Sequence, residues 1–378
     1  MKYLLSALIS LSFLFGCSPS IIKIKPEAAD EIYSMFGKTP ERNFYTPQSI
    51  GDTLIKKWEN DVNGGFAYSS VTAYGNFIFA SDLSGQVFCF DNNNGKTIGR
   101  LRYKGAVFSA PIVDKTKIFF AVAPENDNES DLISYNFLLG KEFFDVKIKG
   151  KILTEIVKAD SSLIFTTEDG KIFKYTLYGE KKWEFDCEVF THSSPAVDDG
   201  IIFLGDDKGE ILAINFNDGK LIYRKKIKKA LPFYSGAAIR DGMAFIGNDD
   251  GKLYSVDIKS GSIKWEFNTN TRITMIPAIK NDTIIIGNLN GDLYAIKKSN
   301  GSQIWKISTG GLLNATPLIA NNSIILPDYN RNFYLINISS GKIFKTYKLE
   351  GRVKLSPVIA DSTLFIGYEN GNICAYKF

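Results

Sequence analysis

The stretch Gly287-Asn288-Leu289-Asn290-Gly291-Asp292-Leu293-Tyr294-Ala295-Ile296, followed by Gly301-Ser302-Gln303-Ile304-Trp305, decides the fold of this chain. It places Asn-Gly between two apolar alternations, which is a strong short-range signal for a β-hairpin because the tight turn needs positive φ. Related phrases return throughout the 378 residues. A short-strand repeat with a period of about 40 residues predicts a propeller or a linear array.

The turn position, or its substitute, recurs eight times. It falls at Gly85, Ser130, Gly170, Gly209, Gly251, Gly291, Arg331 and Gly371. The long first gap predicts an insertion near Pro124–Glu129. The acidic pairs Asp206-Asp207 and Asp249-Asp250 lack the 12-residue ligand loop of a calcium site and its final Glu, so they predict turn chemistry and no metal.

A final strand with the pattern Gly-x-x-x-Trp follows several of these turns, as in Gly261 to Trp265. A Trp at one position of a repeat predicts packing between neighbouring units rather than a ligand cage. The last repeat stops at Phe378, before its own Trp strand, whereas residues 54–59 resemble that strand and contain Trp58. We therefore expect an all-β, eight-bladed β-propeller of four-stranded antiparallel blades over residues 53–378. The N-terminal strand should complete the C-terminal blade and remove the open edges that favour aggregation.

The N-terminus has the pattern of a targeting segment. Lys2 precedes an apolar run that is too short to span a bilayer, and residues 14–17, Leu-Phe-Gly-Cys, resemble the bacterial lipobox. Residues 1–16 are thus predicted to be a lipoprotein signal peptide, with Cys17 becoming the acylated first residue. An ordinary signal peptide is the alternative. Ser18 stands where Asp would favour inner-membrane retention, so the expected location is the outer membrane, lipid-anchored and facing the periplasm.

Residues 17–52 contain four prolines and no clear periodicity. They are predicted to form a flexible tether, with a possible short helix around Ala28–Phe36. Cys89, Cys187 and Cys374 show neither disulfide nor metal spacing and are expected to be small buried side chains.

Composition narrows the classes of partner. The net charge is only +4 with 44% apolar residues, which argues against a nucleic-acid-binding protein, since such a protein needs a clustered basic face. The one basic run, residues 224–229, has an alternation that fits an exposed strand and loop.

The phrases Gly251-Lys252-Leu253-Tyr254-Ser255-Val256-Asp257 and residues 291–296 resemble the PQQ-type β-propeller repeat. With the lipobox and eight blades, the chain is similar to the BamB family of outer-membrane assembly lipoproteins. The resemblance implies a non-catalytic periplasmic scaffold in the outer-membrane β-barrel assembly machinery. Such a scaffold would dock on BamA-like POTRA domains, contact other assembly subunits and aid insertion of outer-membrane proteins.

In that family the BamA-contacting loops connect the last strand of one central blade to the first strand of the next, which implies residues 187–194 and 228–236 here. The family's Leu/Arg and Asp pairs are not matched. Aromatic side chains at blade connections are expected to be exposed and suited to interfaces. The candidate partner-binding residues are Val189, Phe190, His192, Leu231, Phe233 and Tyr234. The alternative is that they pack over the mouth of the ring. Phe190→Asp or Phe233→Asp is predicted to weaken partner capture without unfolding the ring.

Enzyme functions find little support in the sequence. A PQQ-dependent dehydrogenase needs calcium ligands and an aromatic floor, commonly with adjacent cysteines, whereas all four Trp fall on the packing position and no two Cys adjoin. His192 is the single histidine, and a Ser next to it in sequence is not a catalytic triad. No catalytic residue, cofactor or metal ligand is predicted. The alternatives are a periplasmic propeller that binds a small ligand and a relative of the PQQ-dependent dehydrogenases.

Overall fold

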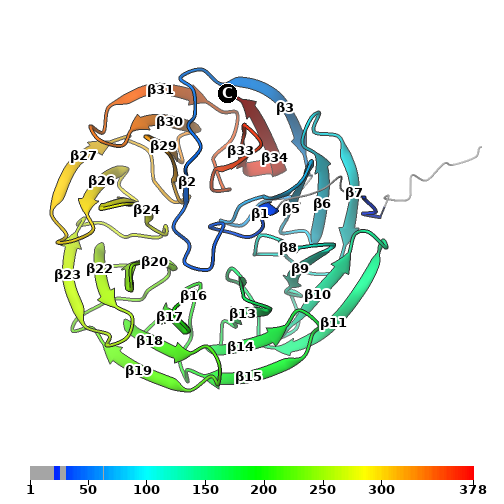
Figure 1. The fold of residues 1–378 in the computed structure, drawn as a ribbon, viewed down its shortest axis with the longest axis horizontal. Helices are drawn as coiled ribbons and strands as arrows, with labels where there is room; N and C mark the ends of the chain where they lie inside the picture. Colours follow the sequence, from blue (N-terminus) through cyan, green and yellow to red (C-terminus); the bar gives the residue numbers. More distant parts are fainter. Residues whose placement is uncertain (1–20, 26–30, 63) are drawn as a thin grey trace, which may run out of the picture.

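The computed structural model describes residues 21–25, 31–62 and 64–378, which form eight sheets arranged in a ring (Figure 1). The predicted all-β, eight-bladed propeller of four-stranded antiparallel blades is confirmed. Within the described residues, no helix is long and apolar enough to cross a membrane.

The four strands of each blade run from the ring's axis outward. Blades 1 to 4 consist of β4 Thr72–Tyr74, β5 Phe77–Ser81, β6 Gln86–Asp91 and β7 Thr97–Arg102; β8 Ile112–Asp114, β9 Lys117–Val122, β10 Glu129–Asn136 and β11 Lys141–Lys149; β12 Val157–Ala159, β13 Ser162–Thr166, β14 Lys171–Thr176 and β15 Lys181–Asp186; and β16 Ala196–Asp198, β17 Ile201–Gly205, β18 Glu210–Asn215 and β19 Leu221–Lys226.

Blades 5 to 8 follow the same order. They consist of β20 Ala237–Arg240, β21 Met243–Gly247, β22 Lys252–Asp257 and β23 Ile263–Asn268; β24 Ala278–Lys280, β25 Thr283–Gly287, β26 Asp292–Lys297 and β27 Gln303–Ser308; β28 Leu318–Ala320, β29 Ser323–Pro327, β30 Asn332–Asn337 and β31 Ile343–Lys348; and β32 Val358–Ala360, β33 Thr363–Tyr368, β34 Asn372–Lys377 and β3 Ile55–Asp61. A 3-10 turn, Glu369–Gly371, joins β33 to β34.

The ring closes as the sequence predicts, by a strand from the other end of the chain. β3 pairs antiparallel with β34, with Ile55 opposite Lys377, Trp58 opposite Ala375 and Asp61 opposite Asn372. The C-terminal blade therefore obtains its outer strand from the N-terminal side, and the two ends of the ring are joined by a complete strand ladder.

Most middle hairpins have the expected turn. Gly291 has φ 85°, and Arg331, which replaces glycine in blade 7, is also in the left-handed region at φ 67°. Ser130 is an exception to the predicted series, because it lies inside β10 and pairs with Ile148. In blade 2 the insertion moves the connection to residues 123–128, so the turn position cannot be assigned by period alone.

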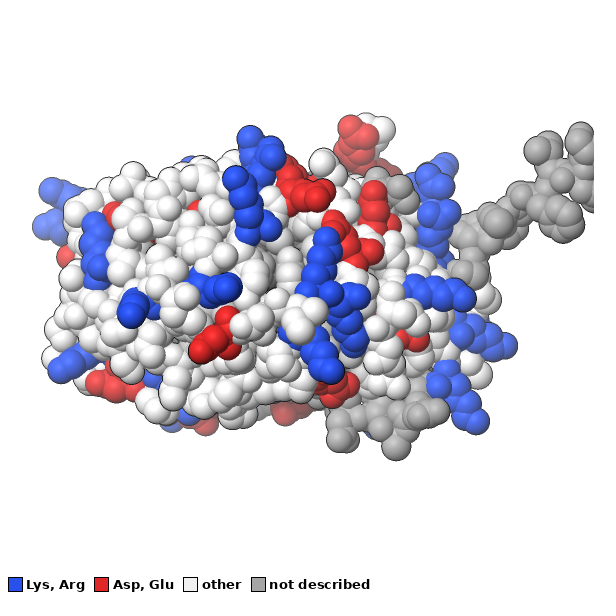
Figure 2. Space-filling view, turned by 90° about the horizontal axis from the view of Figure 1, so that it is seen from above, with Lys and Arg blue, Asp and Glu red and all other residues white. Residues whose placement is uncertain are grey.

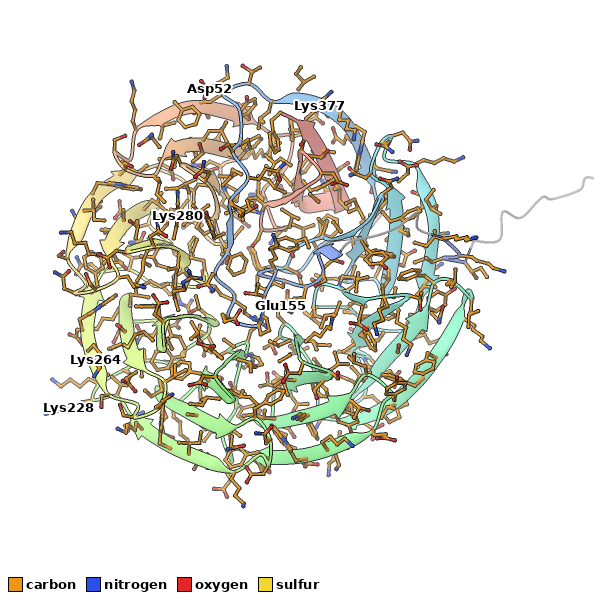
Figure 3. The ribbon with its side chains drawn as sticks, viewed as in Figure 1. Asp52, Glu155, Lys228, Lys264, Lys280 and Lys377 are labelled. Atoms are coloured by element: carbon orange, nitrogen blue, oxygen red, sulfur yellow. The ribbon has the colours of Figure 1, made fainter. Side chains whose placement is uncertain are left out.

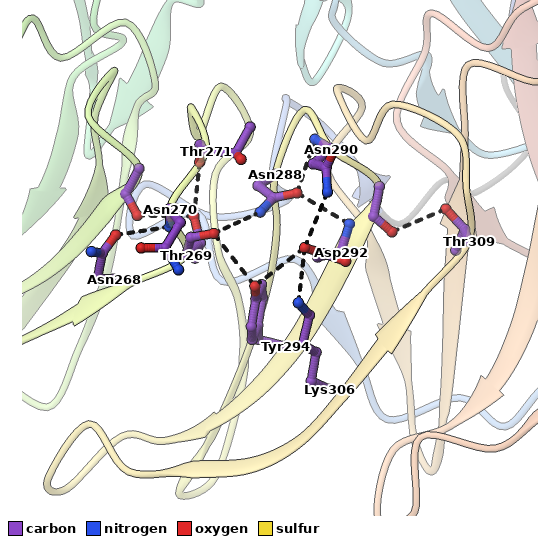
Figure 4. A network of polar contacts seen from close by, with 12 residues as sticks. Asn268, Thr269, Asn270, Thr271, Asn288, Asn290, Asp292, Tyr294, Lys306 and Thr309 are labelled. Atoms are coloured by element: carbon purple, nitrogen blue, oxygen red, sulfur yellow. Dashed lines mark hydrogen bonds and ion pairs between the residues drawn. The ribbon is translucent and has the colours of Figure 1, made fainter.

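Polar side chains hold the middle hairpin of blade 6 to the loop of the preceding blade. In blade 6, Asn288 donates from Nδ2 to the Thr269 carbonyl (3.1 Å) and accepts at Oδ1 from the N–H groups of Asn290 (3.0 Å) and Asp292 (3.1 Å) (Figure 4). Lys306 pairs with Asp292 at 3.0 Å. The Asn288 side chain thus satisfies backbone groups in a tight turn, as the turn chemistry of the sequence predicts.

The same contact recurs at the Trp position of four blades and confirms that this Trp packs between neighbouring blades. A Cβ added to Gly301 would lie 2.7 Å from Cδ2 of Trp265, whose Nε1 donates to the Lys298 carbonyl (2.9 Å). The ring of Trp265 therefore covers the turn of the next blade, where only glycine fits. Equivalent contacts join Trp58 to Gly95, Trp183 to Gly219 and Trp305 to Gly341.

Two blades lack an aromatic side chain at this position, and each has a structural reason. In blade 1 the position is Gly99, and the following turn glycine, Gly140, faces Ile21 (3.3 Å) and Lys23 of the N-terminal segment instead. In blade 7 the position is Lys345. This residue has no turn to cover, because the third and fourth strands of the next blade, β34 and β3, come from opposite ends of the chain and are not joined by a turn.

The predicted flexible tether is wrong for the part of residues 17–52 that the structure describes. β1 (Glu31–Tyr33) pairs with β4, and β2 (Tyr45–Thr46) pairs with β28. Between them the chain crosses the axis (Figure 1), and its carbonyls accept hydrogen bonds from five inner strands. The bonds are Val113 N to Ser34 O, Val197 N to Pro40 O, Ile239 N to Glu41 O, Ile279 N to Asn43 O and Ile319 N to Phe44 O. Apolar periodicity cannot reveal such a segment, because its contacts come from blades far away in sequence.

Three further predictions concern a short helix, the signal peptide with Cys17, and the other three cysteines. The short helix is wrong over residues 31–36, which contain β1, while residues 28–30 lie outside the described part. The signal peptide and Cys17 also lie outside the described residues. Cys89, Cys187 and Cys374 are free and buried, as predicted.

Candidate partner-binding face

One face of the ring carries the loops that lead from each outer strand to the next inner strand, together with the middle hairpins. We call it the loop face; its described loop residues are 62, 64–71, 103–111, 150–156, 187–195, 227–236, 269–277, 309–317 and 349–357. The loops are held by a recurring backbone bond from the next hairpin, such as Asp207 N to Phe190 O (3.1 Å) and Asp249 N to Pro232 O (3.1 Å). Side chains on these loops are therefore presented by a fixed backbone.

Three of the predicted partner-binding side chains are exposed on adjacent loops of this face. Phe190 is 59% exposed, and Leu231 and Tyr234 of the next loop are also exposed. His192 connects the two loops, since its ring lies edge-on to Tyr234 with centroids 5.5 Å apart. The structure thus brings Phe190, His192, Leu231 and Tyr234 onto one surface, which we call the aromatic site.

Phe233 and Val189 do not belong to that surface, contrary to the expectation from sequence. Phe233 is fully buried, stacks edge-on against Tyr254 (5.9 Å) and lies against Gly205. Val189 is buried with its carbonyl against the hairpin glycine Gly170. A charge at Phe233 would be placed in the hydrophobic core, so Phe233→Asp should unfold blades 4 and 5 rather than report on partner capture.

Carboxylates around His192 favour its charged form. Its Nδ1 lies 2.7 Å from Oδ2 of Asp207, and its Nε2 lies 3.6 Å from Oε1 of Glu168. The hydrogen bond with Asp207 is the main cause that raises the pKa of His192, and burial opposes it. The aromatic site therefore contains a half-buried imidazole that protonates more readily than a free one.

Sequence reasoning missed the acidic partners in this site. Within each acidic pair, one side chain stabilises the turn, as Asp206 does by accepting from the N–H groups of Lys208 and Glu210 (both 2.9 Å). The other faces the neighbouring loop: Asp207 bonds His192, and Asp249 accepts from Arg272 Nε (2.8 Å). The doubled acid at the hairpin was the available signal, since a turn needs only one.

Arg272 extends the site toward blade 6. Its guanidinium carbon lies 5.7 Å from the centroid of the Tyr234 ring, while the same group is held by Asp249. Tyr and Arg are enriched in protein interfaces, where planar side chains contribute contact area at little entropic cost. The aromatic site therefore has the composition of a protein-binding surface.

A central cavity of about 530 Å³ opens at the axis among these loops. Its wall includes the aromatic rings of Phe66, Phe108 and Tyr234, and its floor includes Glu155, near the centre of the ring in Figure 3. Among the described residues, no group of three or more His, Cys, Asp or Glu side chains is placed to hold a metal ion.

Glu155 is an acid buried at the axis. Its Oε2 accepts from Ala110 N (2.9 Å), and its carbonyl accepts from Nη2 of the buried Arg42 (3.2 Å). Burial raises the pKa of Glu155 to about 7, although the nearby Arg42 charge acts in the opposite direction. Arg42 belongs to the segment that crosses the axis, so this pair links that segment to the loop before blade 3.

The chain matches a known protein family over the whole ring. A family model described as outer membrane protein assembly factor BamB matches residues 51–230, 129–272 and 249–378, which overlap and together include every blade. This chain belongs to the BamB family.

Individual BamB relatives are distant. The chain is 21% identical over 240 residues to the outer membrane protein assembly factor BamB of Yersinia pestis, covering 60% of this chain and 59% of that protein. The match thus spans less than two thirds of the relative's length. The crystal structure of BamB from Moraxella catarrhalis is similar with a TM-score of 0.73 at 15% identity, over 86% of this chain and 100% of that one.

The propeller fold by itself does not distinguish a BamB protein from an enzyme with the same fold. The quinohemoprotein alcohol dehydrogenase ADHIIG from Pseudomonas putida HK5 is similar with a TM-score of 0.76 at 12% identity, over 92% of this chain and 80% of the enzyme. At such identities the likeness shows the fold only, and one fold supports many functions. Membership of the BamB family therefore rests on the sequence match, and the role of particular residues on the site itself.

Proposed function

We propose that this chain is a non-catalytic lipoprotein scaffold of the outer-membrane β-barrel assembly machinery. Its aromatic site docks on BamA-like POTRA domains and thereby aids insertion of outer-membrane proteins, together with other subunits. Residues 1–16 are the signal peptide, Cys17 carries the lipid, and residues 53–378 are the docking ring. The observation that carries the proposal is the fixed array of exposed Phe190, Leu231 and Tyr234 on adjacent loops.

A non-catalytic role agrees with the chemistry of the central cavity. Its described lining contains one carboxylate, Glu155, which is hydrogen-bonded to a backbone N–H and lies close to Arg42. Trp265, like the other described tryptophans, covers a blade turn instead of this cavity. The quinone-dependent alternative would be supported by tight binding of PQQ with calcium to the purified chain.

The first test is capture of partner proteins by Phe190→Asp and Tyr234→Asp, purified from membranes in mild detergent. Each variant should retain roughly tenfold less of the BamA-like protein, because an interface aromatic contributes about 1–2 kcal/mol or more. Quantitative mass spectrometry of the co-purifying proteins provides the measurement.

Ile263→Asp is the matched control, since Ile263 is equally an exposed apolar side chain but lies on the outer strand of blade 5. It should capture the partner like the wild type. Thermal unfolding should show that all three variants are folded. Equal capture by the wild type and both loop-face variants would contradict the docking proposal.

The second test concerns the anchor. Cells supplied with labelled palmitate should incorporate it into the wild-type chain and not into Cys17→Ser, because acylation requires the thiol at that position. A multiply acylated cysteine gives stable membrane attachment without a transmembrane helix. A wild-type chain that carries no label would contradict the assignment of Cys17.

A further inference from the structure

The turns between the third and fourth strands differ sharply in chemistry around the ring. In five blades the turn tips are polar: Asn93-Asn94, Asn217-Asp218, Lys259-Ser260, Ser299-Asn300 and Ser339-Ser340. Blade 2 instead has Leu138-Leu139, and blade 3 has Tyr178. Since every one of these turns is formed by a glycine with positive φ, folding alone does not require apolar tips in these two adjacent blades.

These tips are held outward by local hydrogen bonds. The N–H groups of Leu138 and Leu139 both donate to Oδ1 of Asn136 (3.0 and 2.9 Å), and Tyr178 N donates to Oγ1 of Thr176 (3.2 Å). Leu139 is 56% exposed and Tyr178 is 70% exposed. The side chains are therefore displayed to solvent by a defined backbone.

Two further exposed apolar side chains lie next to these tips. Phe143 is exposed and its ring lies 5.9 Å from Tyr178, with Nζ of Lys117 3.5 Å from the Phe143 centroid. Ile21 is exposed and approaches the turn glycine Gly140, next to Leu139. We call this surface the rim patch; it consists of Ile21, Leu138, Leu139, Phe143 and Tyr178. Large contiguous apolar surfaces of this kind mark sites of association.

The position of the chain's N-terminal side indicates what covers the patch. Ile21 is only four residues after Cys17. Four extended residues span at most about 14 Å, so a lipid on Cys17 would hold Ile21 close to a membrane surface. This step rests on the acylation in the proposed function.

Charge around the rim patch fits a bilayer with anionic headgroups. Lys23 and Lys25 follow Ile21, and Lys117 and Lys141 lie at adjacent strand ends. Of the acids nearby, Glu180 pairs with Lys182 (3.4 Å), while Glu142 accepts a hydrogen bond from the neutral Tyr103 (2.8 Å) and keeps its charge, so the four lysines outnumber it. Figure 2 shows Lys and Arg side chains gathered at the right-hand end of the ring, the side of β7 and β11 in Figure 1.

We propose that the rim patch rests in the interface of a phospholipid bilayer with anionic headgroups, so that the ring is oriented on the membrane by its own surface as well as by the lipid. Leucine and aromatic side chains enter the boundary between headgroups and acyl chains, while lysines contact phosphates. The rivals for this surface are residues 1–20 of the same chain and a second copy.

The experiment uses the acylated full chain on vesicles of phosphatidylethanolamine and phosphatidylglycerol. Leu139→Cys carries an environment-sensitive fluorophore, and Ile304→Cys, at an exposed position on the outer strand of blade 6, is the matched control. Cys89, Cys187 and Cys374 are buried, which directs labelling to the introduced thiol. Spin-labelled lipids should quench the label at position 139 severalfold more than that at 304, and the difference should shrink in vesicles of phosphatidylcholine.

The outcomes separate this inference from the proposed function. A chain that does not float with vesicles contradicts acylation and, with it, the argument for the patch. A chain that floats but shows equal quenching at positions 139 and 304 overturns the rim patch alone. A label at 139 that is shielded from both water and lipid would also overturn it, in favour of residues 1–20 or, where shielding depends on protein concentration, a second copy.

Discussion

The environment of the buried acid Glu155 forms only when distant segments of the ring come together. Its carboxylate lies at the axis, where the loop before blade 3 meets Arg42 of the crossing segment. Nothing in the local sequence distinguishes it from exposed acids such as Glu180. Its hydrogen-bond partners Arg42, Ala110 and Ser194 lie 113, 45 and 39 positions away in the sequence.

The protonation of Glu155 predicts a specific dependence of stability on pH. Its pKa is about 7 in the folded chain against 4.5 for the free side chain, so the folded state holds the proton more tightly. The resulting stabilisation is complete below about pH 4.5 and is lost as the pH rises through 7, by roughly 1–3 kcal/mol. Urea unfolding at several pH values should show this decline in the wild type and a flatter profile for Glu155→Gln.

The exposed Glu180 provides the control for that measurement, since its side chain is 69% exposed. Glu180→Gln should leave the profile between pH 4.5 and 7 unchanged. Identical pH profiles for the wild type and Glu155→Gln would show that Glu155 titrates normally.

The aromatic site shows the limit of prediction at the same scale. The positions of the two loops follow from the sequence, because turns and strand starts can be counted, and the expected exposure of Phe190 and Tyr234 on them is confirmed. It could not separate Phe233 from Tyr234, since irregular loops have no periodicity to assign a side chain to one face. Burial of Phe233 depends on the space above Gly205, which only the neighbouring blade defines.

At the scale of elements, an aromatic ring lies over a glycine turn of the next blade at six of the eight junctions, all except those that follow blades 1 and 7. Phe144 and Tyr223 take the place of Trp against Gly179 and Gly261. The sequence motif Gly-x-x-x-Trp therefore combines two half-contacts: its glycine receives the preceding blade and its Trp covers the following one.

Gly301→Ala should destabilise the ring more than Gly242→Ala. Both glycines have positive φ, 74° and 72°, so both substitutions carry a backbone cost of roughly 1 kcal/mol. A Cβ at 301 would in addition lie 2.7 Å from Trp265, whereas that at 242 meets nothing within 4 Å. The difference between their unfolding midpoints in urea measures the contact between blades 5 and 6.

An equal loss of stability in Gly301→Ala and Gly242→Ala would mean that Trp265 moves aside at no cost in free energy. The glycine at 301 would then be needed for its backbone conformation only. A larger loss at 301, by about 1 kcal/mol or more, is expected because overpacked cores relax incompletely.

At the scale of the whole molecule, the two proposed surfaces do not compete. The rim patch is built from turns between third and fourth strands, which lie at the opposite ends of the strands from the loop face. A ring that contacts the bilayer through blades 2 and 3 therefore leaves Phe190 and Tyr234 free for a partner. The membrane contact and the docking contact can then act together to position a bound subunit.

The sequence by itself determined the number of blades, their strand order and the closure by the strand that contains Trp58, because these follow from local periodicity and turn chemistry that recur along the chain. It also located the loops of the candidate site. Only the tertiary structure decided that residues 31–50 cross the axis, that Ile21 and Lys23 stand in for the missing aromatic of blade 1, and that Phe233 is buried. Each of these depends on contacts between segments distant in the chain, whose geometry is set by closure of the ring and leaves no periodic signal in the residues themselves.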